Sequence, residues 1–215
     1  MRDKIEYNLR YNKNKISISS PEEQGLNYNI SGDIQFKPFY FEGSITIKNQ
    51  KIENFLDNIL SKLLLYNENY LGNLNGLLKI KLKNINNKVL KNGELNFSIN
   101  EKKINLVNAN FKLDKIGDLV SIINSSEKQG DIFFISQNTL TISDHIEFAK
   151  VFQISSKKVK NIKQINFNLE KELGKKEFSI TNVKINNIEN NQKSNQIFFV
   201  KNIQNLRMHI RKVID

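Results

Sequence analysis

Cysteine and tryptophan are absent from this 215-residue chain, which contains only two prolines and two histidines. Without cysteine, the chain can form neither disulfide bonds nor a cysteine-based metal site. His145 and His209 are far apart in the sequence, and neither belongs to a cluster with metal-ligand spacing. We therefore expect no metal centre and no catalytic arrangement built on histidine.

Long apolar runs are also absent, since no segment approaches the ~18 consecutive apolar residues of a membrane-spanning helix. The N-terminal residues Met1–Glu6 contain no apolar core of the kind found in signal peptides. Alternation of apolar and polar residues begins already at Ile5. From this early start we expect the chain to be the C-terminal part of a longer protein, with any targeting segment outside it.

Motifs that carry chemistry are missing as well. The nine glycines are isolated and form neither a G-x-G-x-x-G nor a G-x-x-x-x-G-K phosphate loop. The acidic residues are scattered: Glu22 and Glu23 belong to a turn, and Glu170 and Glu172 flank Lys171. We therefore expect a protein that is not an enzyme and that uses no cofactor.

The net charge is +11, a balance that suits nucleic acid or an anionic membrane surface. One stripe of lysines alternates along a predicted strand, and a second cluster lies near residue 158. These are Lys79, Lys81, Lys83, Lys157, Lys158 and Lys160. The aromatic residues occupy the opposite, apolar positions, whereas binders of single-stranded nucleic acid carry both kinds on one face. A solvated face is the first interpretation, contact with anionic head groups is the second, and nucleic acid is not expected.

Alternation with period two dominates the sequence and predicts about a dozen strands. The clearest strand runs from Leu95 to Ile99, directly after the tight-turn pair Asn92-Gly93. The parity shifts by one at Leu106-Val107, where a β-bulge would keep the apolar face continuous. Strands are expected near residues 5–11, 16–18, 28–36, 39–47, 78–82, 95–99, 104–113, 133–135, 140–142, 165–169, 178–185 and 197–200.

Helical spacing is rare in this chain. Apolar residues three and four apart predict an amphipathic helix at about 53–66, and shorter helices are expected at 116–123 and 206–214. Polar loops are expected at 124–131 and 186–196. These helices are too few for a parallel α/β fold. The predicted class is mainly β: a single region over 1–215 with an extended, curved antiparallel sheet, groove-like or sandwich-like, and two or three short helices.

Almost every predicted strand has one apolar face, which needs a cover. If the sheet closes on itself or on a second sheet, the apolar side chains form a solid core. If it stays partly open, its concave side is an apolar trough, and large exposed apolar surfaces mark binding sites. Acyl chains would suit such a trough.

One stretch of the chain has a recognisable pattern. Residues 72–119 read GNLNGLLKIKLKNINNKVLKNGELNFSINEKKINLVNANFKLDKIGDL. The G-x-L-x-G-x-L entry, the N-G-x-L turn and strand, and the K-I-G-D-L ending resemble the C-terminal region of the AsmA-like family of Gram-negative bacteria. The segment Phe41–Ile47 and the helix predicted after it also fit, so that the resemblance extends over residues 32–130.

The resemblance implies a periplasmic protein that is associated with the inner membrane and has a groove-like β-sheet linked to phospholipid movement and envelope integrity. It implies phospholipids and envelope proteins as partners, membrane association through a segment outside this chain, and no catalytic residues. The groove positions would be Leu78, Ile80, Leu82, Leu95, Phe97, Ile99, Phe111 and Leu113. Lys79, Lys81 and Lys83 would meet head groups at the rim. The alternative is a structural or adhesive scaffold with a closed core and no ligand.

Overall fold

The computed structural model describes residues 6–21, 27–49, 51, 75–100, 103–128, 131–172, 175, 177–189, 197–201 and 203–214. Within these ranges the chain forms thirteen strands and three helices, which confirms the predicted mainly β fold with a few short helices. The chain divides into two compact units, Met1–Val107 and Asn108–Asp215.

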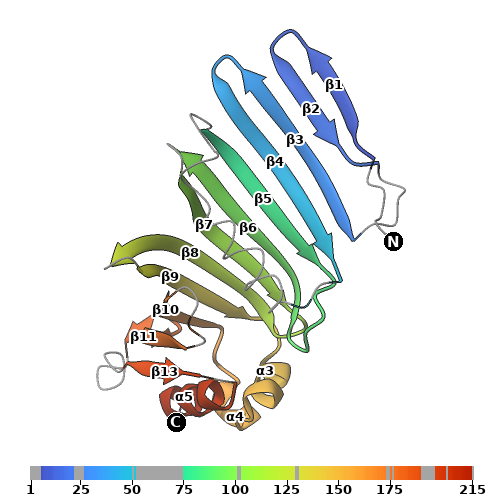
Figure 1. The fold of residues 1–215 in the computed structure, drawn as a ribbon. Helices are drawn as coiled ribbons and strands as arrows, with labels where there is room; N and C mark the ends of the chain where they lie inside the picture. The colour runs from blue at the N-terminus through green and yellow to red at the C-terminus, as the bar shows by residue number, and fades with distance from the viewer. Residues whose placement is uncertain are drawn as a thin grey trace. The chain divides into compact units, whose positions relative to one another are not determined.

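The first unit is a sheet whose strands lie side by side in chain order, as Figure 1 shows. Its strands are β1 (Asn8–Asn12), β2 (Lys15–Ser19), β3 (Tyr28–Phe36), β4 (Phe39–Lys48), β5 (Asn75–Lys83) and β6 (Leu90–Asn100). Strand β7 (Lys103–Leu113) begins in this unit and continues into the second. Alternation of apolar and polar residues matches the two faces of such a sheet, which is why these strands were predictable.

One pairing departs from the antiparallel arrangement that was expected. Strands β4 and β5 are parallel, whereas β1 to β4 and β5 to β6 pair in antiparallel fashion. Parallel neighbours need a crossover connection of a dozen or more residues, and the chain between Lys48 and Asn75 is long enough for one. The helix predicted at 53–66 lies outside the described residues.

The second unit contains the remaining strands and the three described helices. It contains β8 (Gly117–Lys128), β9 (Asp131–Ile142), β10 (Gln164–Glu172), β11 (Phe178–Ile185), β12 (Ile188–Glu189) and β13 (Phe198–Val200). Its helices are α3 (His145–Phe152), α4 (Ser156–Val159) and α5 (Ile203–Ile214). Strands β7 to β12 are neighbours in chain order, and β13 pairs with β11. Helix α5 contacts both β13 and α3.

The region from 116 to 142 differs most from the prediction. The helix expected at 116–123 and most of the loop expected at 124–131 belong instead to β8, which pairs with β9 in register from Gly117 to Lys128. Strand β9 runs unbroken from Asp131 to Ile142, where two separate strands were expected at 133–135 and 140–142. Backbone pairing over the whole length of both strands outweighs the local turn preference of their polar residues. The short strand β12 likewise lies inside the predicted loop 186–196.

The parity shift predicted in β7 is present. Leu106 and Ala109 are both buried although they are three residues apart, and Val107 between them is exposed. The boundary between the two units falls at the same place, after Val107. The buried residues of β7 therefore change from even to odd numbers near Val107, where the first unit ends.

A polar cluster lies within the second unit. Ser121 and Asn138 face each other across β8 and β9, with 2.7 Å between the Ser121 hydroxyl and Asn138 Oδ1, and both side chains are buried. The Asn138 amide nitrogen donates to the Ser136 hydroxyl and to the carbonyl of Phe167. Since each polar group of Asn138 has a partner, the cluster is a satisfied structural network.

Candidate functional site: the apolar face of the first unit

The strand register lines up one apolar face across the first unit. Ile45 on β4 pairs with Ile30 on β3 and with Ile80 on β5, and Ile80 pairs in turn with Leu95 on β6. Since paired residues point to the same side of a sheet, the face is continuous from strand to strand. Its side chains are Leu9, Tyr11, Ile16, Ile18, Tyr28, Ile30, Ile34, Phe41, Ile45, Ile47, Leu78, Ile80, Leu82, Leu95, Phe97 and Ile99.

Exposure along this face changes steeply from one end to the other. Phe97 and Ile80 are only 1% and 2% exposed, whereas Leu9 and Tyr11 on β1 are 69% and 74% exposed. Strands β2 and β3 carry half-buried residues on the same face. The face is therefore closed at β5 and β6 and open at β1 to β3.

The predicted groove residues lie on the closed part or outside this unit. Six of them line the apolar face of β5 and β6 and are buried: Leu78, Ile80, Leu82, Leu95, Phe97 and Ile99. Phe111 and Leu113 belong to the second unit, where Leu113 is buried and Phe111 is half-buried. Because side chains buried to this degree act as core, the six residues are not an accessible lipid surface in this structure.

The three lysines predicted at the rim lie on the other side of the sheet. Lys79 and Lys81 pair with Asn96 and Glu94 of β6, and Lys79 Nζ lies 3.3 Å from a carboxylate oxygen of Glu94. Lys83 follows on the same face because alternate residues of a strand share a side. The lysines therefore cannot border the apolar face formed by Leu78 and its neighbours, and their place on the polar face supports the interpretation as a solvated stripe.

Aromatic residues gather at the open end of the face, and sequence reasoning did not single them out. The rings of Tyr11 on β1 and Phe36 on β3 are 6.5 Å apart between centroids. Phe39, paired with Phe36 in the β3–β4 hairpin, is also exposed, and Tyr28 is exposed at the opposite end of β3. The alternation showed that these residues face the apolar side, but only the strand order shows that they lie near an edge.

Glycines allow an aromatic ring to lie flat on this face. Gly32 and Gly43 pair with each other, and the Phe41 ring lies 3.3 Å from the position that a Cβ atom at Gly32 would take. A Cβ at Gly43 would overlap the same ring. The ring covers backbone that has no side chain of its own, an arrangement that stabilises glycine in strands.

The opposite face of the same strands is polar and internally paired. Asp33 on β3 lies 2.8 Å from Lys15 Nζ and accepts a 2.7 Å hydrogen bond from the Ser17 hydroxyl, both on β2. The bond from Lys15, with that from Ser17, lowers the pKa of Asp33 below its ordinary value. The polar face therefore holds β2 against β3 and leaves the apolar face as the candidate binding surface.

Groups suited to covalent or metal chemistry do not come together in the described residues. Across those ranges no group of three or more His, Asp or Glu residues could hold a metal ion. No helix in the part of the chain that the structure describes is long and apolar enough to cross a membrane. The described residues of the first unit instead form a sheet with one apolar and one polar face.

Comparison with known proteins indicates neither a family nor a function for this chain. No protein-family model matches the chain. No curated protein matches it either.

Proposed function

We propose that this chain is a non-enzymatic module that binds the acyl chains of phospholipids on the open apolar face of β1 to β3. The observation that carries the proposal is the change in exposure along one continuous face, from closed at β5 and β6 to open at β1. The resemblance to the AsmA-like family supports a place in the periplasm, associated with the inner membrane, and a role in envelope lipid transport or integrity.

The physical basis is burial of apolar surface. Each acyl methylene removed from water contributes about 0.8 kcal/mol, so a few methylenes on this face give measurable binding. Leu9 and Tyr11 offer the most exposed surface, and the aromatic pair Tyr11 and Phe36 provides a broad contact. Because many similar contacts share the energy, single truncations there are expected to weaken binding only mildly.

The test places charge on the open face without disturbing the core. In the double variant Leu9→Asp/Tyr11→Asp, two carboxylates would have to be desolvated by a bound acyl chain, so lipid retention should fall at least about tenfold. Both side chains are exposed in the protein, so the fold should remain. The measurement is extraction of the purified protein, followed by mass spectrometry of phospholipid per protein.

A matched control exists on the same strand. Asn8 and Asn12 alternate with Leu9 and Tyr11 on β1 and are also exposed, but they lie on the polar face. Asn8→Asp/Asn12→Asp adds the same charge to the same strand and should leave lipid retention unchanged. Equal retention in both double variants would contradict the proposal.

The second candidate is a structural or adhesive scaffold without a ligand. The burial of Phe97, Ile80 and Leu95 favours it, because these residues behave as a closed core. It predicts that the protein, purified from a lysate that contains membranes, carries no phospholipid at all.

A further inference from the structure

We propose that the helical end of the second unit, formed by α3, α4 and α5, is a docking surface for the anionic head groups of a phospholipid membrane. The proposal rests on the proposed function and adds to it, since it names where the membrane that supplies or receives the lipid is contacted. Figure 1 shows the three helices gathered beside β13.

The lysines near α4 point outward because their neighbours are held in the core. Val159 and Ile162 are buried, whereas Lys157, Lys158, Lys160 and Lys163 are exposed. Two apolar anchors three residues apart turn the residues between and beside them toward solvent. The four cations therefore project into solvent from one short segment of the chain.

A side-chain clamp fixes the same segment. Asn186, in the turn after β11, accepts from the backbone N–H of Lys163 at 2.9 Å and donates to the carbonyl of Asn161 at 2.8 Å. The backbone from Asn161 to Lys163 is thus held by one side chain from the turn after β11.

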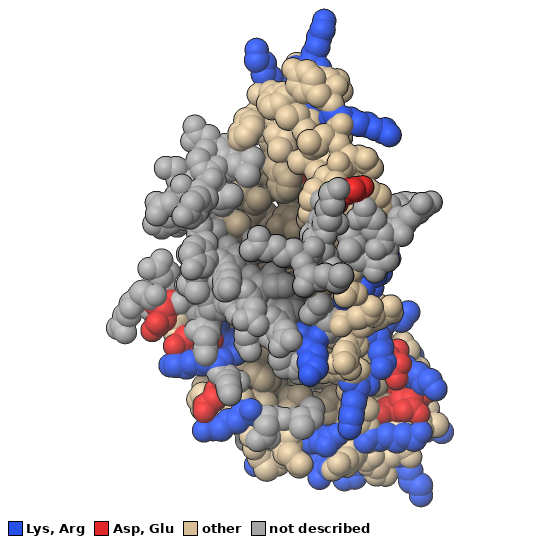
Figure 2. All heavy atoms as spheres, turned by 45° about the vertical axis from the view of Figure 1, so that its right-hand side comes forward, with Lys and Arg blue, Asp and Glu red and all other residues tan. Residues whose placement is uncertain are grey.

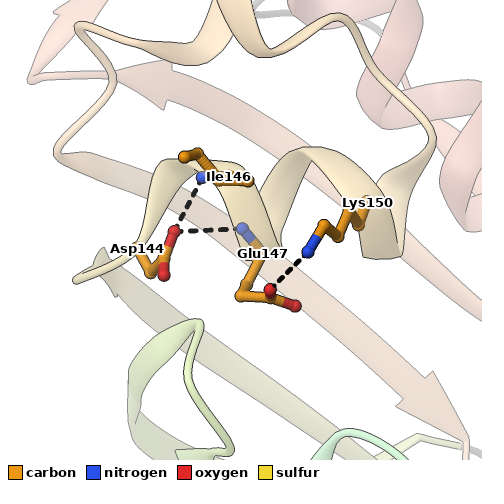
Figure 3. A network of polar contacts seen from close by, with 4 residues as sticks. All are labelled: Asp144, Ile146, Glu147 and Lys150. Carbon is orange, nitrogen blue, oxygen red and sulfur yellow. Dashed lines mark hydrogen bonds and ion pairs between the residues drawn. The ribbon is translucent and has the colours of Figure 1, made fainter.

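Charge is strongly one-sided over this end of the unit. Residues 143–163 and 203–214 contain eight lysines and arginines against two carboxylates, Asp144 and Glu147. Figure 3 shows that both carboxylates are engaged: Asp144 Oδ1 accepts from the N–H groups of Ile146 and Glu147, and Glu147 pairs with Lys150 at 2.7 Å. Among the described residues, no carboxylate forms an ion pair with Lys157, Lys160 or Lys163.

The two arginines of α5 join the helices. Arg207 donates to the carbonyl of Val151 at 2.7 Å, and Arg211 donates to the carbonyl of Phe152 at 3.3 Å. Both carbonyls belong to the last turn of α3, where no N–H of the same helix can reach them. The arginines therefore hold α5 against α3, and the lysines carry the outward positive charge.

Exposed aliphatic side chains are present on the other two helices. Ile146 on α3 is 50% exposed and Met208 on α5 is 43% exposed. Surfaces that lie on anionic membranes combine such apolar side chains with lysines, each of which contributes about 1 kcal/mol near the bilayer. In the described part of α3, α4 and α5, no phenylalanine or tyrosine is exposed, and Phe199 on the neighbouring β13 is 63% exposed. Binders of single-stranded nucleic acid stack successive bases on several aromatic rings, so the surface favours lipid over nucleic acid.

The excess of basic residues at the helical end is greater than that of the whole chain, which contains 33 lysines and arginines against 22 acidic residues. Figure 2 shows Lys and Arg side chains outnumbering Asp and Glu on the face that it draws. On β5, however, Lys79 is paired with Glu94, so that stripe is partly neutralised. The two lysine groups are therefore suited to a direct comparison in one protein.

The experiment is co-sedimentation of the full chain with vesicles of phosphatidylcholine alone or with about one-third phosphatidylglycerol. The chain should bind only the anionic vesicles, and about 0.5 M NaCl should release it because salt screens exposed charges. Lys157→Glu/Lys160→Glu should weaken binding at least about tenfold, from about 1 kcal/mol per lysine. The matched control, Lys81→Glu/Lys83→Glu on β5, should change it less than about threefold.

Two outcomes would overturn the proposal. Equal loss in both double variants would show attraction by net charge alone. A chain that binds single-stranded RNA more tightly than anionic vesicles, with the same loss in Lys157→Glu/Lys160→Glu, would assign the surface to nucleic acid.

Failure of the proposed function is measured separately. Lys157→Glu/Lys160→Glu should keep the extractable phospholipid of the wild type, and Leu9→Asp/Tyr11→Asp should keep vesicle binding. Vesicle binding without extractable lipid would therefore refute the acyl-binding face and leave the docking surface standing.

Discussion

Gly76 lies opposite Phe41 in the parallel pair of β4 and β5, and its backbone closely approaches that of the neighbouring strand. A Cβ atom there would overlap the backbone carbonyl of Phe41, which cannot rotate away. Gly76→Ala should therefore lower the free energy of unfolding by about 3 kcal/mol, measured by urea denaturation.

Gly32 provides the control for that substitution. A Cβ at Gly32 would have its nearest heavy atom, the Glu42 carbonyl oxygen, at 3.1 Å, a contact that small shifts relieve. Gly32→Ala should cost less than about 1 kcal/mol. Equal costs at the two positions would contradict the close approach of β4 and β5.

Asp144 gives a prediction about pH. Hydrogen bonds from the backbone N–H groups of Glu147 and Ile146 lower the pKa of Asp144 below its ordinary value. A lowered pKa in the folded state means that the carboxylate stabilises the fold above the ordinary pKa, and this contribution is lost as pH falls through the folded-state value. At neutral pH, Asp144→Ala should lower the melting temperature by roughly 2–4 °C, a typical cost of losing a helix cap.

The pH dependence separates the charge from the hydrogen bonds. The difference between wild type and Asp144→Ala should be constant at neutral pH and shrink as pH falls below about 5, because the wild-type carboxylate then becomes protonated. Asp144→Asn keeps the capping oxygen and should lie between the two at neutral pH. Thermal melts followed by circular dichroism measure all three, and a difference that does not shrink in acid would rule out the charge contribution.

At the scale of the element, α3 depends on residues far away in the sequence. Its C-terminal turn closes at Gln153, whose φ of 56° is left-handed, and the carbonyls of Val151 and Phe152 are satisfied by Arg207 and Arg211. Arg207→Ala should cost about 1–2 kcal/mol, because a hydrogen bond from a charged donor is lost at a half-buried carbonyl.

Lysine is the informative second substitution at that position. Arg207→Lys keeps the charge near the end of α3 but loses the guanidinium geometry, and it should recover only part of the stability. Denaturant unfolding of both variants measures the effect. If Arg207→Ala unfolded at the same denaturant concentration as the wild type, the contact would not contribute to the docking of α5.

Elements with a strong apolar pattern could be predicted from the sequence. Elements whose structure depends on contacts with distant parts of the chain could not. The alternation of Leu95, Phe97 and Ile99 identified β6, and helical spacing identified α5. Helix α3 was missed because it has only eight residues and the arginines that satisfy its C-terminal carbonyls lie more than fifty residues away. Its N-cap Asp144, followed by Glu147 in the first turn, was the one local signal that could have identified it. Strand β8 was mistaken for a helix and a loop because its C-terminal half is polar, and the long ladder with β9 decides its structure.

At the scale of the whole molecule, the division into two compact units predicts more than one unfolding transition. Each unit has buried large side chains of its own, represented by Phe97 in the first and Phe148 in the second. Differential scanning calorimetry should therefore give a van't Hoff enthalpy smaller than the calorimetric enthalpy, since two cooperative units violate two-state behaviour.

Two core variants would show which unit gives rise to each unfolding transition. Phe97→Ala and Phe148→Ala should each cost about 3–5 kcal/mol and lower one transition, a different one in each case. A single transition shifted equally by both variants would show that the two units unfold together. Because Phe97 is almost fully buried, its substitution tests stability and not ligand binding.

The sequence by itself determined the strands with clear alternation, the two faces of each of those strands and the absence of cysteine chemistry, because alternation and composition are local properties. Which part of the apolar face is open was decided only by the tertiary structure, since exposure depends on what lies beside each strand. Leu9 and Leu95 have the same alternating pattern, yet Leu9 is exposed on the edge strand β1 and Leu95 is buried within the sheet. The candidate site therefore lies on strands β1 to β3. The residues of β5 and β6, where the sequence predicted it, are buried.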